Sequence, residues 1–155
     1  MRSIKYILII WSAVLLLESC TDDKCYSDTE SMVEAGLNVQ DEALDTTSFL
    51  DSLSVYSSKW NDSIHYSASD NPNISFMLSP TSDTSEIIFT SKTISLKDTV
   101  FFYYHREIVF ISPECGFGTN FNIVSVKHTY NNIDSINITK PEILVEQNGQ
   151  IEIYF

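Results

Sequence analysis

Apolar and polar residues alternate with a period of two along much of the chain after residue 30, and this pattern limits the possible folds more than any other feature. Short apolar or alternating runs are separated by clusters of Ser, Thr, Asn and Asp, as in strands joined by turns. Apolar residues at helical spacing form no long stretch, and residues 40–48 have room for one short helical turn at most. The runs are Met32–Val39, Phe49–Tyr56, Ile74–Leu78, Glu86–Thr90, Val100–Tyr104 and Ile108–Ile111.

Two of these runs, 100–104 and 108–111, are almost wholly apolar, and this predicts central strands that are buried on both faces. The polar residues 105–107 between them predict a turn or a bulge. Asn131-Asn132 and Asn148-Gly149 predict tight hairpins, because Asn and Gly tolerate the positive φ of such turns. The second hairpin would place four apolar residues on one face, the expected core face: Leu144, Ile151, Ile153 and Phe155.

These runs predict eight to ten short strands in one domain. A chain of this kind buries its sheets against each other, so we expect an all-β fold with a single β-sandwich of Ig-like or Greek-key type. Little or no helix is expected after the N-terminal segment. A β-barrel is the alternative architecture.

The first twenty residues have the features of an export signal. Arg2 and Lys5 precede a short apolar run from Tyr6 to Leu17, which suits a signal peptide and is shorter than the roughly 20 residues of a spanning helix. The following Leu17-Glu18-Ser19-Cys20 resembles a lipobox, the site at which bacterial lipoproteins are lipidated on cysteine and cleaved. The alternative is an ordinary signal peptide followed by an incidental cysteine.

The organisation expected from these features has three parts. Residues 1–19 are a lipoprotein signal peptide, residues 20–30 are the lipidated cysteine and an acidic tether, and residues 31–155 are the β-sandwich domain. The tether is expected to join the domain to a membrane through lipid on Cys20.

The charge of the mature chain limits its partners. Cleavage removes two basic residues and one acidic residue from the 9 and 21 of the whole chain, which leaves 7 basic and 20 acidic residues and a net charge of −13. Such a surface repels phosphate backbones and anionic lipid headgroups. We therefore expect no nucleic-acid partner, and we expect lipid rather than a basic patch to hold the protein at the membrane.

The three cysteines suit an exported protein. If Cys20 carries lipid, Cys25 and Cys115 remain as an even pair in an oxidising compartment. A bridge between them would close a loop of about 90 residues and contribute roughly 4 to 5 kcal/mol in the chain-entropy model. The alternatives are two free thiols, or a Cys20–Cys25 bridge in a protein without lipid.

Several segments together resemble a family of small Bacteroidota lipoproteins of unknown function. They are the spaced cysteine near the tether, Ser112-Pro113-Glu114-Cys115-Gly116-Phe117, His128-Thr129-Tyr130-Asn131-Asn132-Ile133-Asp134 and Ile151-Glu152-Ile153-Tyr154-Phe155. The resemblance covers most of the mature chain and implies an all-β domain in a Bacteroidota cell envelope. Asp22-Asp23 after Cys20 also resembles the surface-export signal of such lipoproteins. The expected location is therefore the outer membrane, facing either the cell surface or the periplasm.

No known catalytic or metal-binding motif occurs in the chain, so no catalytic residue, metal or cofactor is predicted, and an enzyme is the least favoured class. His65, His105 and His128 are far apart in the sequence, and none has a second ligand at metal-binding spacing. Glu107 and Glu114 carry little information as a glycosidase pair in so acidic a chain.

Two functions fit these observations. The first is a non-catalytic envelope lipoprotein that binds another envelope protein or supports an assembly. The second is a surface lipoprotein that captures glycans with outward aromatic rings, for which Phe102 and Tyr104 are the candidates. Asp-Ser/Thr triplets also resemble the O-glycosylation site of exported Bacteroidota proteins, and the predicted acceptors are Thr46, Ser52 and Ser63.

Overall fold

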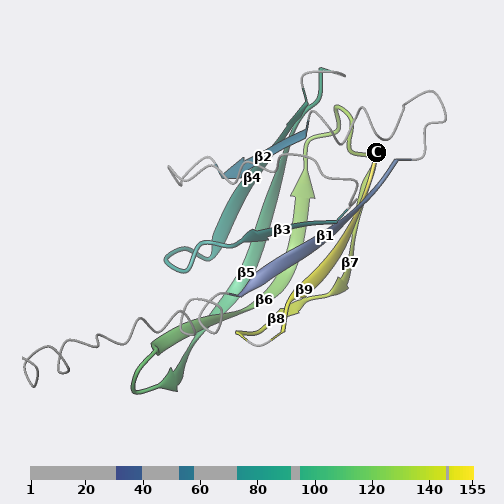
Figure 1. The fold of residues 1–155 in the computed structure, drawn as a ribbon. Coiled ribbons are helices and arrows are strands. Elements are labelled where there is room, and N and C mark those ends of the chain that lie inside the picture. Colours follow the sequence, from purple (N-terminus) through teal and green to yellow (C-terminus); the bar gives the residue numbers. More distant parts are fainter. Residues whose placement is uncertain (1–30, 40–52, 58–72, 92–94, 146) are drawn as a thin grey trace, which may run out of the picture.

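The computed structural model describes residues 31–39, 53–57, 73–91, 95–145 and 147–155, and every regular element in these ranges is a strand. The strands form two sheets (Figure 1). In spatial order, the four-stranded sheet contains β3 (Asn73–Met77), β1 (Met32–Asn38), β9 (Gly149–Tyr154) and β7 (Ser135–Lys140). The five-stranded sheet contains β2 (Leu53–Ser57), β4 (Thr84–Ser91), β5 (Lys97–Ser112), β6 (Gly116–His128) and β8 (Glu142–Ile143).

The two sheets pack face to face around one apolar core. Alternate residues of β1, β3 and β9 face alternate residues of β4, β5 and β6, and together they form a continuous buried cluster. The rings of Phe76 on β3 and Phe102 on β5 join the two layers, with centroids 5.5 Å apart. The predicted all-β sandwich is therefore confirmed, and the barrel alternative is wrong because the described strands form two separate sheets.

The Asn148-Gly149 hairpin is not formed. The chain turns earlier, where the backbones of Leu144 and Gln147 exchange hydrogen bonds of 2.8 and 3.0 Å, and then crosses from β8 in one sheet to β9 in the other. Gly149 is buried at this crossing, where an added Cβ would collide with the Ile143 side chain. A glycine is therefore required at position 149 by the close approach of the Ile143 side chain and not by a tight turn. The predicted core face is confirmed for Ile151, Ile153 and Phe155, whereas Leu144 is only half-buried.

The Asn131-Asn132 hairpin is also not formed, because these residues lie on the connection from β6 to β7 and so cross between the sheets. The fully buried Asp98 carboxylate holds this connection. It accepts hydrogen bonds from Thr129 Oγ1, Asn131 N, Asn132 N and Ile133 N at 2.6, 3.0, 2.7 and 3.2 Å. The Asp98 side chain on β5 thus stabilises a connection between the sheets where the local sequence predicts a tight turn.

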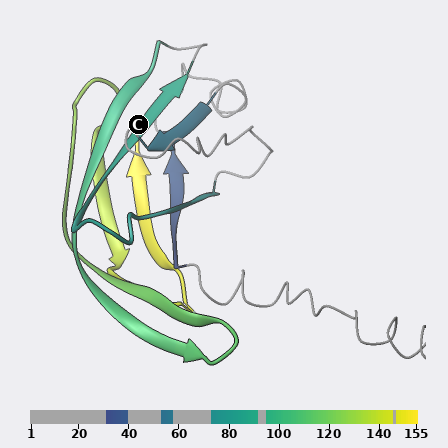
Figure 2. The ribbon, with the colours of Figure 1, turned by 90° about the vertical axis from the view of Figure 1, so that its left-hand side faces the viewer.

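β5 runs without interruption from Lys97 to Ser112, so the turn predicted at residues 105–107 is wrong. The irregularity lies one residue earlier: Tyr103 pairs with Ser125 and Tyr104 with Ile123, which leaves Val124 of β6 as a bulge. Residues 108–111 are not a core strand, because they belong to the part of β5 that extends beyond the sandwich. Figures 1 and 2 show this long β5–β6 hairpin at the end of the domain where β1 begins.

The predicted signal peptide (1–19), tether (20–30) and helical turn (40–48) lie outside the described residues. Within the described ranges, no helix has the length and hydrophobicity needed to cross a membrane.

Candidate functional site: the projecting hairpin of β5 and β6

The distal half of the β5–β6 hairpin, residues 105–120, is called the arm below. Beyond Tyr104, β6 is the only described strand that pairs with β5, because β4 ends its pairing at Thr84 opposite Tyr103. On the other side, β8 pairs with β6 only at Phe121 and Asn122, so no described strand pairs with β6 along the arm. The arm is consequently a two-stranded ribbon, and Figure 2 shows it curving beneath the sandwich.

The tip of the arm is a short turn at residues 113–115. Ser112 Oγ accepts a hydrogen bond from Cys115 N at 3.1 Å, and Gly116 has a φ of 74°, a conformation that favours glycine. Cys115 is disulfide-bonded. Cys20 and Cys25 both lie outside the described residues, so the choice of Cys25 as its partner stays a prediction.

One face of the arm is apolar and open to solvent. Ile108, Phe110 and Phe117 are 72, 61 and 68% exposed. Phe110 and Phe117 are registered partners whose rings meet edge to face, with centroids 5.4 Å apart. These three side chains, called the apolar patch below, continue the row of β5 and β6 residues that faces the core within the sandwich. They project beyond the opposing sheet, which explains why core-like residues are exposed.

The other face of the arm is mixed, with His105 and Glu107 near its base and Val109 and Ile111 nearer its tip. Beside the short strand β8 it forms a shallow cavity of about 270 Å³, slightly below the usual size of a small-molecule site. Its lining combines polar and charged residues with Leu144 and Phe121: His105, Arg106, Glu107, Asn120, Asn122 and Glu142. Among the residues that the structure describes, no three His, Cys, Asp or Glu side chains are grouped as a metal site requires.

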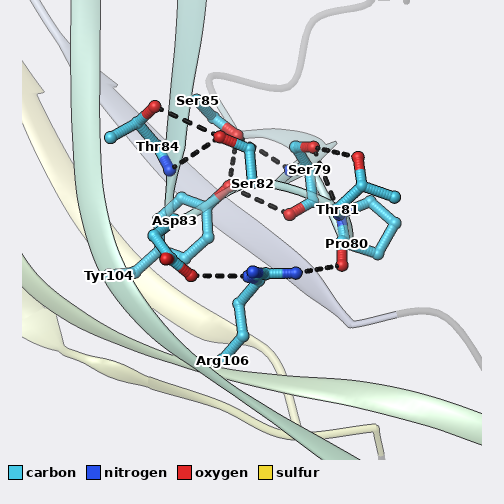
Figure 3. Close-up of polar contacts among 9 residues, drawn as sticks. All are labelled: Ser79, Pro80, Thr81, Ser82, Asp83, Thr84, Ser85, Tyr104 and Arg106. Atoms are coloured by element: carbon cyan, nitrogen blue, oxygen red, sulfur yellow. Dashed lines mark hydrogen bonds and ion pairs between the residues drawn. The ribbon is translucent and has the colours of Figure 1, made fainter.

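A polar network fixes the root of the arm, and it is buried around Tyr104 and exposed around Arg106 (Figure 3). The Tyr104 hydroxyl donates a hydrogen bond to the Ser79 carbonyl at 3.0 Å and lies 2.7 Å from Ser85 Oγ, which accepts a bond from Ser79 N at 2.8 Å. Arg106 Nε contacts Asp83 Oδ1 at 2.7 Å, and its Nη1 donates to the Pro80 carbonyl at 2.6 Å. The arm is therefore tied to the loop between β3 and β4.

Tyr104→Phe is expected to lower the free energy of unfolding by about 1 to 2 kcal/mol at neutral pH, because it removes a buried hydroxyl and leaves the Ser79 carbonyl without its donor. The loss can be measured by urea unfolding followed by circular dichroism. Tyr103→Phe is the matched control, and since Tyr103 is partly exposed its effect should stay within about 0.5 kcal/mol. Equal losses in the two variants would contradict the structural role of Tyr104.

The same pair of proteins tests the pH dependence. Burial raises the pKa of Tyr104, although its hydrogen bonds with Ser85 and Ser79 act in the opposite direction. The folded protein therefore keeps this proton at pH values where the unfolded chain releases it. The resulting stabilisation is complete below the unfolded pKa of about 10 and is lost as the pH rises through the raised value. The advantage of the wild type over Tyr104→Phe should shrink above pH 10.

The predicted ligand-facing role of Phe102 and Tyr104 is wrong, because both side chains are buried. All four residues of 101–104 are aromatic, so alternation could not indicate which two face inward. Pairing with β4 and β6 places Phe102 and Tyr104 in the core and directs Phe101 and Tyr103 outward. The predicted modification sites lie outside the described residues: Cys20 for lipid, and Thr46, Ser52 and Ser63 for glycans.

Sequence reasoning missed the apolar patch. The run 108–111 predicts a buried strand, since an apolar run has the same composition in a core and on an exposed interaction surface. The available signal was the length of the two apolar-rich segments on either side of Cys115. Strands of globular proteins usually have about five or six residues. Two strands of that length would bury fewer apolar residues than the chain has between 97 and 128.

Ser31, directly before β1, also belongs to this end of the domain. Its hydroxyl donates a hydrogen bond of 2.7 Å to the carbonyl of Thr119, and Thr119 is the registered partner of Ile108. The chain thus enters the sandwich beside the apolar patch.

Comparison with known proteins identifies a family for this chain. The model of a family of unknown function (DUF6452) matches residues 52–155, which cover more than half of the chain and include the whole arm. No curated protein and no solved structure matches.

Proposed function

The chain belongs to this family of unknown function, and on that premise we propose that it is an exported lipoprotein of the bacterial envelope. Lipid on Cys20 holds it at the outer membrane, and its sandwich is a non-catalytic structural or protein-binding module. The observation that carries the proposal is the order of parts. A basic start and a short apolar run lead to Leu17-Glu18-Ser19-Cys20, and Ser31, eleven residues later, already packs against the folded domain.

The disulfide at Cys115 supports export. Disulfides persist in oxidising compartments such as the bacterial periplasm and the cell surface, and are rare in the cytosol. With Cys20 lipidated, Cys25 is the remaining partner in the chain. A Cys25–Cys115 bridge would hold the tether against the tip of the arm.

A non-catalytic role is supported by two buried polar side chains, Asp98 and Tyr104, whose hydrogen bonds are made to loops of the domain. The Asp98 carboxylate is saturated by donors from the β6–β7 connection, and the Tyr104 hydroxyl bridges Ser79 and Ser85. Both groups stabilise loops in the described part of the chain.

The anchor can be tested by growing cells with an alkyne analogue of palmitate and attaching a fluorophore to the labelled proteins. We expect the wild type to carry the label, Cys20→Ala to lose it, and Cys25→Ala to keep it. A Cys20→Ala protein that retained the label would contradict the proposal, as would an unlabelled wild type. The mass of the N-terminal peptide should also place cleavage directly before Cys20.

Protease treatment of intact cells then separates the two possible orientations. Digestion in intact cells places the domain on the cell surface, whereas protection until the outer membrane is opened places it in the periplasm. An inner periplasmic protein controls for the integrity of the cells.

Glycan capture is the second candidate function, and the outward rings of β5 favour it. Phe101 and Tyr103 line a shallow cavity of about 220 Å³ with Thr84, Ser85 and Glu86, and Lys127 Nζ lies 5.6 Å from the centre of the Tyr103 ring. An aromatic platform beside polar side chains suits a sugar, because flat rings stack on apolar sugar faces while polar groups bind hydroxyls.

A glycan array probed with the mature protein tests this alternative. Any glycan that binds should lose affinity at least tenfold with Tyr103→Ser and should be unaffected by Tyr130→Ser, which removes an exposed ring from a different loop. Absence of binding across the array, or equal losses in the two variants, would remove glycan capture by this face.

A further inference from the structure

The apolar patch of Ile108, Phe110 and Phe117 has the size of the largest apolar patch on a typical soluble monomer. With about 200 Å² for each large side chain, the exposed fractions leave roughly 400 Å² of mainly apolar surface. The largest patch on a monomer usually covers about 300 to 600 Å² and is often functional. The patch is also held in a defined shape by the Phe110–Phe117 contact and by the root network of Tyr104 and Arg106.

The surroundings of the patch indicate an apolar partner. Residues 108–119 contain one charged residue, Glu114 in the terminal turn, although the chain as a whole carries a net charge of −12. The segment has no basic residue with which to bind an anionic group. Attraction at this surface must therefore come from burial of its aliphatic and aromatic side chains.

The patch lies at the end of the domain where the tether from Cys20 enters, and this position favours a lipid bilayer as the apolar partner. Ser31 is hydrogen-bonded to Thr119, next to Ile108, and Cys20 is eleven residues upstream of Ser31. At 3.3 to 3.6 Å per residue, Cys20 lies within about 40 Å of this point, whatever the arrangement of the intervening residues. Figures 1 and 2 place the arm and the start of β1 at one end of the sandwich and the C-terminus at the other. The tether from a lipid on Cys20 thus enters the domain at the end where the arm projects, and not at the opposite end.

We propose that the apolar patch inserts into the interface of the lipid bilayer and acts as a second, non-covalent contact beside the lipid anchor. This inference rests on the proposed lipidation of Cys20. Aromatic and aliphatic side chains are favoured at the boundary between headgroups and acyl chains. A segment with the single acidic residue Glu114 is repelled less by anionic lipids than the strongly acidic remainder of the chain. The contact would fix the orientation of the domain, with the Tyr103 face exposed at the side.

A second copy of the chain is a weaker candidate for the occupant. Two patches of this size would bury roughly 800 Å² in total, and stable protein–protein interfaces bury about 1,200 Å² or more. A bilayer has no such minimum, because the covalent anchor already supplies the high local concentration.

The test uses the mature chain from Cys20, coupled by maleimide to a lipid in phosphatidylcholine vesicles while the Cys115 disulfide is kept intact. In a Trp60→Phe background, which leaves this mature chain without its natural tryptophan, Phe110→Trp reports on the patch and Tyr130→Trp on the distant β6–β7 loop. We expect the emission of the indole introduced at position 110 to shift to shorter wavelength and to be quenched by brominated acyl chains. The indole introduced at position 130 should behave as in water. Equal, water-like behaviour of the two indoles would overturn the proposal.

A second experiment omits the anchor. Cys20→Ser protein is mixed with the same vesicles, and the bound fraction is measured by flotation. Phe110→Ser/Phe117→Ser should reduce partitioning by about tenfold for each side chain removed, whereas Val124→Ser, an exposed apolar residue on the β6 bulge, should not. Circular dichroism checks that each variant is folded. A concentration-dependent dimer that the double variant abolishes, without vesicle binding, would assign the patch to a second copy instead.

The two proposals can fail independently. The vesicle experiments supply the anchor chemically or omit it, so they measure the patch alone. Palmitate labelling in cells measures the anchor alone. A labelled protein whose Phe110→Trp indole stays exposed to water would overturn only the insertion, and an unlabelled protein would overturn the lipoprotein assignment on which the role of the insertion depends.

Discussion

Phe102→Ala is expected to lower the free energy of unfolding by about 4 kcal/mol, the typical cost of replacing a fully buried phenylalanine by alanine. The ring of Phe102 is completely buried and contacts Phe76 of the opposing sheet. Its removal opens a cavity where the two layers meet, and the rigid sheets cannot close it. Urea unfolding followed by circular dichroism measures the loss.

Phe101→Ala is the matched control, because it removes a phenylalanine ring from the preceding residue, whose side chain lies on the outer face of the sheet. It should cost less than about 1.5 kcal/mol, since the ring is only partly buried. If Phe102→Ala does not fold, Phe102→Leu keeps most of the apolar volume and should lose about 1 kcal/mol. A greater loss for Phe101 than for Phe102 would invert the assignment of the two faces.

Asp98→Ala is expected to cost about 3 kcal/mol, because it leaves three backbone N–H groups and the Thr129 hydroxyl without their acceptor. The connection from β6 to β7 would lose the group that holds it against β5. Asp98→Asn retains one oxygen but directs an NH₂ group at an N–H donor, so we expect it to recover less than half of the loss. The same unfolding measurement applies.

Asp134→Ala removes an acidic residue from the same connection, where the side chain is exposed. Its effect should stay within about 0.5 kcal/mol. If Asp98→Ala and Asp134→Ala lose the same stability, the effect comes from the loss of one negative charge, and the hydrogen bonds of Asp98 do not contribute. If Asp98→Asn is as stable as the wild type, its hydrogen bonds contribute less than the geometry indicates.

The strand content and much of the core could be predicted because alternation is a local property. Ser75 separates Ile74 from Phe76, and Glu152 separates Ile151 from Ile153. Each pair is buried as its pattern indicates. A period of two assigns the faces of a strand whenever one face is polar. The strands predicted from this rule at 32–39, 74–78 and 86–90 are confirmed, whereas the first half of the run 49–56 lies outside the described residues.

The prediction of faces was wrong where alternation was absent. All the residues of Phe101–Tyr104 are aromatic, so either pair could face inward, and pairing with β4 decided the outcome. The run Ile108–Ile111 was expected in the core, but the second sheet does not extend over it. Burial depends on what lies opposite a strand, and no local pattern contains that information.

The predicted hairpins were wrong for a related reason. Asn148-Gly149 and Asn131-Asn132 have suitable turn residues, yet both lie where the chain passes from one sheet to the other. Gly149 is explained by the Ile143 side chain beside it, and the Asn131 and Asn132 backbones by the Asp98 carboxylate. The contacting residue lies outside the predicted turn in each case, so the turn residues alone predicted the wrong structure.

The amino-acid order alone thus established the fold class, the inward residues of the alternating strands, the acidic charge and the candidate export signal, because each depends on neighbouring residues or on composition. The tertiary structure decided the sheet order, the crossings, the burial of Asp98 and the projection of the arm, because each depends on contacts between distant segments. The apolar patch belongs to the second group. Its three side chains resemble core residues in sequence, and they become an exposed surface only because the opposing sheet ends before it reaches them.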